Sequence, residues 1–146
     1  MVEQTYNRVD LAVEQLEIAL SLFLRKQSYV AALTLAGAAE EILGKALKFQ
    51  GEQTSLQYKF QGVEPVHTLL NRQPLKWADF NDSENLARNA AKHMASANDA
   101  KVTVNLELAA VWMIVRASEN YDRLGFPRSA KMIEFNEWFY EYMIGV

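Results

Sequence analysis

The sequence contains no cysteine, and only three of its 146 residues are proline and six are glycine. The lack of thiols excludes disulfide bonds, thiolate metal ligands and cysteine nucleophiles, and it is typical of a reducing compartment. The glycine-rich patterns of dinucleotide sites and P-loops are absent, as are strand-like alternation and internal repeats. With proline and glycine so sparse, the chain is predicted to be all-helical.

Long apolar runs are also missing. The apolar stretch at 18–24 is interrupted by a serine and ends at Arg25-Lys26, so it is too short to span a bilayer. Residues 1–4 carry no basic leader. Since half of all residues are hydrophobic, we expect one folded domain over residues 1–146, without a membrane segment and in the cytoplasm.

A surplus of positive charge is absent too, because the formal net charge is -3 at pH 7. Non-specific binding to nucleic acids depends on lysine and arginine side chains that neutralise phosphates. Any contact with nucleic acid must therefore come from a local group of cations.

Apolar residues recur at three- and four-residue spacing, which predicts four long helices with short additions. The expected long helices are 7–27, 28–51, one that begins near Asn81 or Ser83 and carries 86–94, and 102–124. A short extra helix is expected at 65–71 within an otherwise irregular stretch, and an aromatic helix from Ser129 onwards. Gly37 is expected where another helix approaches closely, and Glu40 and Glu41 are expected on the surface.

Some faces allow two interpretations. Leu11, Ile18 and Leu22 form a second apolar stripe on the first helix, which packs either on a second neighbour or on another subunit. The aromatic helix, with its apolar face at Met132 and Phe135, either packs on the bundle or seals a dimer.

Four polar residues share one side of the third long helix. At about 100° per residue, Arg88, Lys92, Asn89 and His93 fall within a sector of about 140°, opposite an alanine-rich side. One interpretation is an ordinary amphipathic helix that faces water. The other is a functional site, because arginine suits phosphate binding, histidine suits proton transfer at neutral pH, and Asn89 is placed to orient the imidazole.

The motif Arg88-Asn89-Ala90-Ala91-Lys92-His93 resembles the R-polar-x-x-x-H motif of HEPN domains, many of which are metal-independent ribonucleases. Residues 38–47 look like the second HEPN helix, and 66–70 look like the His-x-Leu segment that often precedes the motif helix. The similarity covers approximately residues 9–124 and leaves the aromatic helix outside. It implies an HEPN-like four-helix up-and-down bundle.

The resemblance further implies a homodimer in which two motif helices face each other and act on RNA. Arg88, Asn89 and His93 would be catalytic and Lys92 would bind substrate, with no metal or cofactor. A role as a toxin or phage-defence component follows, with a nucleotidyltransferase-type antitoxin as a partner. One departure is Ala95, where toxins of that type commonly have a tyrosine, so regulation through that tyrosine is not expected.

Other functions remain open. A non-catalytic HEPN-like bundle that binds a nucleotide or a partner protein would suit the negative charge and the apolar final helix. A metal enzyme is a third class, although the chain has two histidines and no Glu-x-x-His pair. His67 is either a hydrogen-bonded structural residue or a catalyst, and Trp77 and Phe80 either stack on unpaired bases or pack in the core.

Overall fold

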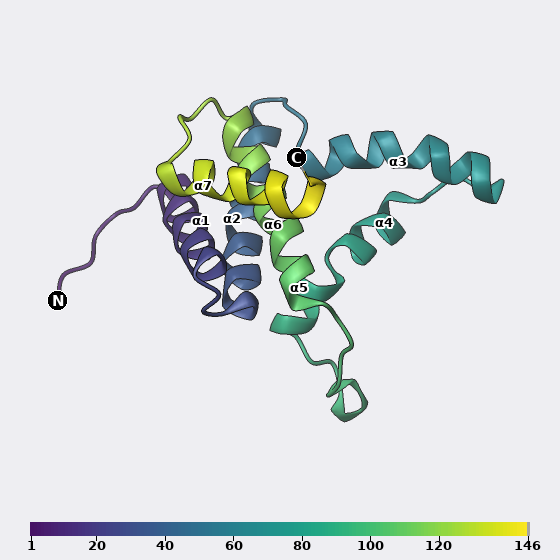
Figure 1. Ribbon diagram of the computed structural model, residues 1–146, viewed down its shortest axis with the longest axis horizontal. Helices are drawn as coiled ribbons and strands as arrows, with labels where there is room; N and C mark the ends of the chain where they lie inside the picture. Colours follow the sequence, from purple (N-terminus) through teal and green to yellow (C-terminus); the bar gives the residue numbers. More distant parts are fainter. Residues whose placement is uncertain (146) are drawn as a thin grey trace.

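The computed structural model describes residues 1–145, and in that range every regular element is a helix (Figure 1). The seven α-helices are α1 (Arg8–Leu24), α2 (Tyr29–Phe49), α3 (Ser55–Asn71), α4 (Trp77–Glu84), α5 (Leu86–Lys92), α6 (Leu106–Arg123) and α7 (Ala130–Phe139). A 3₁₀ turn, η1 (Ala97–Asp99), and a π-helical turn, η2 (Tyr140–Ile144), complete the set. The all-helical prediction is confirmed for these residues, none of whose helices is long and apolar enough to cross a membrane.

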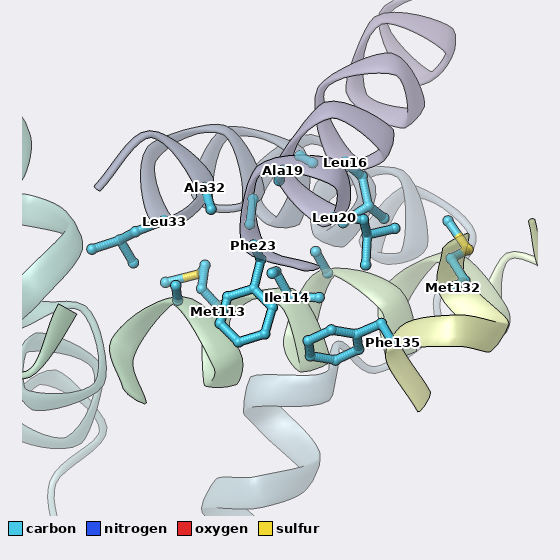
Figure 2. Close-up of a cluster of buried hydrophobic side chains, with 14 of the residues drawn as sticks. Leu16, Ala19, Leu20, Phe23, Ala32, Leu33, Met113, Ile114, Met132 and Phe135 are labelled. Atoms are coloured by element: carbon cyan, nitrogen blue, oxygen red, sulfur yellow. The ribbon is translucent and has the colours of Figure 1, made fainter. Parts of the chain in front are cut away.

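The core is formed by α1, α2, α6 and α7, with α2 packed against both α1 and α6. Buried alanines on three of these helices, such as Ala19, Ala36 and Ala117, let the helix axes approach closely. In Figure 2, Phe23 of α1 and Phe135 of α7 lie beside Ile114 of α6. The centroids of the two phenylalanine rings are 5.5 Å apart, in an edge-to-face arrangement that aromatic pairs favour.

The first two helices begin where the sequence predicted and α2 ends there too, but α1 ends at Leu24, three residues before its predicted end. The side chain of Asn7 accepts a hydrogen bond from the N–H of Val9 at the start of α1, and that of Ser28 accepts one from Ala31 at the start of α2. Gly51, which follows α2, has a φ of +76°, a left-handed conformation that glycine adopts without strain. On the second stripe of α1, Leu22 packs against the core while Leu11 and Ile18 are exposed.

The prediction of an irregular stretch with a short helix at 65–71 is wrong, because α3 is a continuous helix of 17 residues with Pro65 inside it. Thr54 and Gln57 form a capping box that starts this helix. Pro65 removes one backbone donor but does not end the helix. Only its first turn is buried, and the rest of α3 extends away from the body of the protein (Figure 1).

The predicted third long helix is instead two short helices, α4 and α5, and the first of them starts earlier than predicted. Regular structure begins at Trp77, is interrupted at Asn85, and resumes as α5, which ends at Lys92. His93 caps the C-terminus of α5 in an extended conformation, with φ -133° and ψ 142°. The motif therefore occupies a short helix and the residue that follows it.

The last two helices end or begin at the predicted signals, but α6 begins at Leu106, four residues after the predicted start at 102. Gly125 follows α6 with a φ of +83°, and the Ser129 side chain caps α7 by accepting from the N–H of Met132. The hydroxyl of Tyr121 donates to the carbonyl of Pro127 at 2.7 Å, and burial, together with nearby carboxylates, raises the pKa of Tyr121. Since Met132 and Phe135 are buried in the core, α7 packs on the bundle.

Replacing a core isoleucine should test this packing. Ile114 is fully buried, so we expect Ile114→Ala to lower the free energy of unfolding by about 3 kcal/mol through lost burial and an unfilled cavity. Ile133 on α7 is 49% exposed, and Ile133→Ala should change it by about 0.5 kcal/mol or less. Urea unfolding of both variants makes the comparison, and equal effects would contradict the described core.

Candidate functional site

The predicted site residues lie on and just beyond α5, but their side chains have different surroundings. Asn89, Lys92 and His93 are exposed, whereas Arg88 turns toward α2 and its side chain is 15% exposed. The backbone N–H of His93 donates to the carbonyl of Asn89 at 2.9 Å. No hydrogen bond or ion pair joins Arg88 to His93 within residues 1–145, so one chain does not assemble the motif into a connected group.

Arg88 lies directly over Gly37 of α2. A Cβ atom at Gly37 would come within 2.5 Å of Cδ and 3.0 Å of Cγ of Arg88, closer than carbon atoms normally approach. The close approach that the sequence predicted at Gly37 is therefore made by the arginine side chain of α5. The absence of a side chain at Gly37 gives Arg88 its place.

Arg88 shares a carboxylate with a second arginine. Glu40 of α2 is 7% exposed, and its Oε1 accepts a hydrogen bond of 2.8 Å from Nη2 of Arg116 on α6. Its Oε2 lies 3.6 Å from Nη1 of Arg88. The prediction that Glu40 is a surface residue is wrong, because its partner Arg116 allows the charge to be buried. Its neighbour Glu41 is exposed as expected and lies 3.7 Å from Lys45.

Arg116 is held by a second set of contacts at the junction of α4 and α5. Its Nη1 donates to Oδ1 of Asn85 at 3.0 Å and to the carbonyl of Glu84 at 3.3 Å. Nδ2 of Asn85 in turn donates to Oδ1 of Asn81 at 3.1 Å. These contacts fix the break between the two helices, and therefore the position of the α5 backbone that carries Arg88.

Asn120, which is fully buried on α6, ties the same region to α3. Its Nδ2 donates to the backbone carbonyl of Glu40 at 3.2 Å, and its Oδ1 accepts from the N–H of Ser55 at 2.8 Å. Buried amide groups are costly unless both ends are hydrogen-bonded. Asn120 thus anchors the start of α3 beside the carboxylate that holds Arg88.

The two arginines are bound unequally by Glu40. The shorter contact goes to Arg116, whose side chain is 6% exposed, and the longer one goes to the more exposed Arg88. Arg116 therefore makes the stronger contact with the carboxylate, since attraction falls with distance and with access of water. Arg88 retains positive charge that a phosphate can use.

A pocket of about 240 Å³, which we call the cationic pocket, opens beside these residues. The charged side chains that line it are Glu40, Glu41, Lys45, Lys48, Arg88 and Arg116. Trp77 of α4 also lines it and is 39% exposed. His93 is not among its lining residues.

Sequence reasoning missed Glu40, Arg116 and Asn120. A signal was nevertheless present in the sequence, because these polar residues occupy positions at helical spacing from core residues. Glu40 lies three residues before Leu43, and Arg116 lies three residues after Met113. A polar residue on an apolar face is informative because it must have a partner if the face is buried.

The other candidate residues have partners of their own. Nδ1 of His67 lies 3.2 Å from the carbonyl of Gln73, which agrees with a hydrogen-bonded structural residue. Phe80 is buried, with its ring centroid 5.3 Å from that of Phe60, so core packing is confirmed for it. Within residues 1–145, no three histidine, aspartate or glutamate side chains gather closely enough to hold a metal ion.

Comparisons of the chain with protein-family models, curated proteins and solved structures find no match. Membership of the HEPN superfamily thus stays a prediction from the motif and its context.

Neutralising Glu40 should destabilise the protein strongly. Glu40→Gln leaves Arg116 buried without a counter-charge, so we expect the free energy of unfolding to fall by about 3 kcal/mol. Glu41→Gln is the matched control and should cost about 0.5 kcal/mol or less, because Glu41 and Lys45 are exposed. Denaturant unfolding at one pH and salt concentration compares them, and similar losses would exclude a buried pair.

Proposed function

We propose that the protein is a metal-independent endoribonuclease of the HEPN type that acts as a homodimer with a composite site. Arg88, Asn89 and His93 are the proposed catalytic residues, and Lys92 is proposed to bind the substrate. The observation that carries the proposal is the presentation of all four residues by α5 and its C-cap. Arg88 packs on Gly37 and makes a longer contact with a carboxylate that Arg116 also binds.

The proposed reaction uses the imidazole of His93 as a base. It takes the proton from a ribose 2′-hydroxyl, the 2′ oxygen attacks phosphorus, and the bond from phosphorus to the 5′ oxygen breaks. The products are a 2′,3′-cyclic phosphate and a 5′-hydroxyl, whose proton comes from an acid on the opposite side. Arg88 stabilises the charge that develops on the phosphoryl oxygens.

One copy of His93 does not serve both steps easily, because the attacking and leaving oxygens lie on opposite sides of phosphorus. A two-fold dimer supplies a second His93 and a second Arg88. Apolar side chains beside the motif support such a contact: Leu86 and Met94 are 56% and 66% exposed. A groove of about 450 Å³ adjoins the motif, and Leu86, Arg88 and Trp112 are among the residues that line it.

We further propose an HEPN-like bundle arrangement and a role as a toxin or phage-defence component in the cytoplasm. A nucleotidyltransferase-type antitoxin is the proposed partner for that role. The motif is the support for these assignments, together with the surroundings of α5 described above.

The second candidate is a non-catalytic HEPN-like bundle that binds a nucleotide or a partner protein. The packing of Arg88 on Gly37 and its pairing with Glu40 favour it, because these contacts give Arg88 a structural role without any substrate. Exposed apolar residues on the projecting part of α3, Leu69 and Leu70, favour a protein partner.

The two histidines provide a matched test. We expect His93→Ala to reduce cleavage of single-stranded RNA at least about 100-fold, the usual contribution of an acid–base group. His67→Ala removes the other imidazole, which is bonded within α3 and its following turn, and should leave the rate unchanged. Cleavage is measured with purified protein in the presence of EDTA. Equal rates for wild type and His93→Ala would exclude the proposal, and no cleavage by wild type would favour the second candidate.

Gly37→Ala tests the position of Arg88 without substituting any residue of the motif. The new methyl group must displace Cδ of Arg88, so we expect RNA cleavage to fall between about tenfold and a hundredfold. Gly62→Ala is the control, since its Cβ would meet no atom within 4 Å, and it should keep full activity. Full activity in Gly37→Ala would contradict a catalytic role for Arg88 in this position.

A further inference from the structure

The cationic pocket has a charge opposite to that of the whole chain. Four cationic side chains line it, Lys45, Lys48, Arg88 and Arg116, against the two carboxylates of Glu40 and Glu41. The complete chain has a net charge of -3. The potential in a concave site depends mainly on the charges nearest to it, so this pocket attracts anions although the protein is acidic.

In the described part of the chain, one of the four cations has no carboxylate partner, and a second has only a longer contact with one. Glu40 is paired tightly with Arg116, and Glu41 pairs with Lys45 at 3.7 Å in an exposed and therefore weak contact. Arg88 has only the 3.6 Å contact with Glu40, and Lys48 makes no ion pair within residues 1–145. Lys48 and Arg88 are therefore the two cations of the pocket that are most available to an anion.

The wall of the pocket also contains two guanidinium groups, those of Arg88 and Arg116, whose side chains are 15% and 6% exposed. A phosphate group presents oxygens in several directions and suits arginine geometry.

The presence of Trp77 favours a nucleotide over a bare phosphate ion as the ligand of the pocket. Its indole ring lines the same pocket, and aromatic side chains beside phosphate-binding cations commonly stack on unpaired bases. Trp77 is exposed enough for such a contact, whereas its neighbour Phe80 is buried.

We propose that the cationic pocket binds one nucleotide unit of single-stranded RNA, with its backbone phosphate on Lys48 and Arg88 and its base on Trp77. This inference deepens the proposed function, because it assigns a substrate-binding subsite next to the catalytic arginine. It does not require His93, so binding and cleavage can be tested separately.

The test measures binding of a short single-stranded oligouridylate with 2′-O-methyl groups, which lacks the hydroxyl needed for cleavage. Lys48→Gln should weaken binding roughly tenfold and reduce the slope of log affinity against log salt concentration by about 0.7, the loss of one phosphate contact. Lys131→Gln removes the same charge from α7, outside the pocket, and should bind as wild type does. Glu41→Gln removes a pocket carboxylate and should tighten binding.

Unchanged binding in Lys48→Gln, an equal loss in Lys131→Gln, or no binding by wild type would each overturn the inference. Adenosine 5′-monophosphate and inorganic phosphate form the second arm. Binding of either one through Lys48, without binding of the oligonucleotide, would assign the pocket to a free phosphate compound and also overturn the inference.

Trp77→Leu should weaken binding of the oligonucleotide roughly tenfold and leave binding of inorganic phosphate unaffected. His93→Ala should keep all of these affinities, so pocket-dependent binding without cleavage would remove only the nuclease proposal.

Discussion

The buried contact between Glu40 and Arg116 is the interaction on which the positions of α2, α4, α5 and α6 relative to one another depend. Removing two charges from water is costly, and the pair is tolerated because other polar atoms of both residues are hydrogen-bonded, although Nε of Arg116 has no partner within residues 1–145. Arg116 reaches Asn85 and the carbonyl of Glu84, and the backbone of Glu40 accepts from Asn120. Apolar residues of similar size often stabilise a protein more than such a pair, which suggests that this pair is kept for what it positions.

What it positions is the start of α5. The last carbonyl groups of α4 have no partner inside the helix, and no side chain caps the start of α5. Arg116 supplies the missing donor to Glu84 and holds Asn85 in its non-helical conformation. This break directs α5 so that Arg88 lies over Gly37, while Asn89, Lys92 and His93 stay exposed.

The sequence predicted the parts of this arrangement that depend on local signals. Apolar spacing located α1, α2, α6 and α7, with serines at the starts of α2 and α7 and glycines after α2 and α6, but the start of α6 at Asn105 was missed. The continuous helix α3 was missed because Pro65 was interpreted as a boundary, whereas the capping box at Thr54 had already started the helix. The role of Glu40 was missed because its partner Arg116 is 76 residues away: local spacing indicates that each residue needs a partner but does not identify the partner.

The contact lengths at Glu40 explain how one arginine can be both ordered and available. If Arg88 were the only partner of Glu40, a phosphate that bound Arg88 in place of Glu40 would leave the buried carboxylate without a counter-charge. Because Arg116 remains bonded at 2.8 Å, the longer contact to Arg88 can be exchanged for a phosphate oxygen at small cost. The arginine is thus ordered by packing on Gly37 rather than by a strong ion pair. Both the proposed chemistry at α5 and the proposed RNA subsite depend on the difference in length between the two contacts of Glu40.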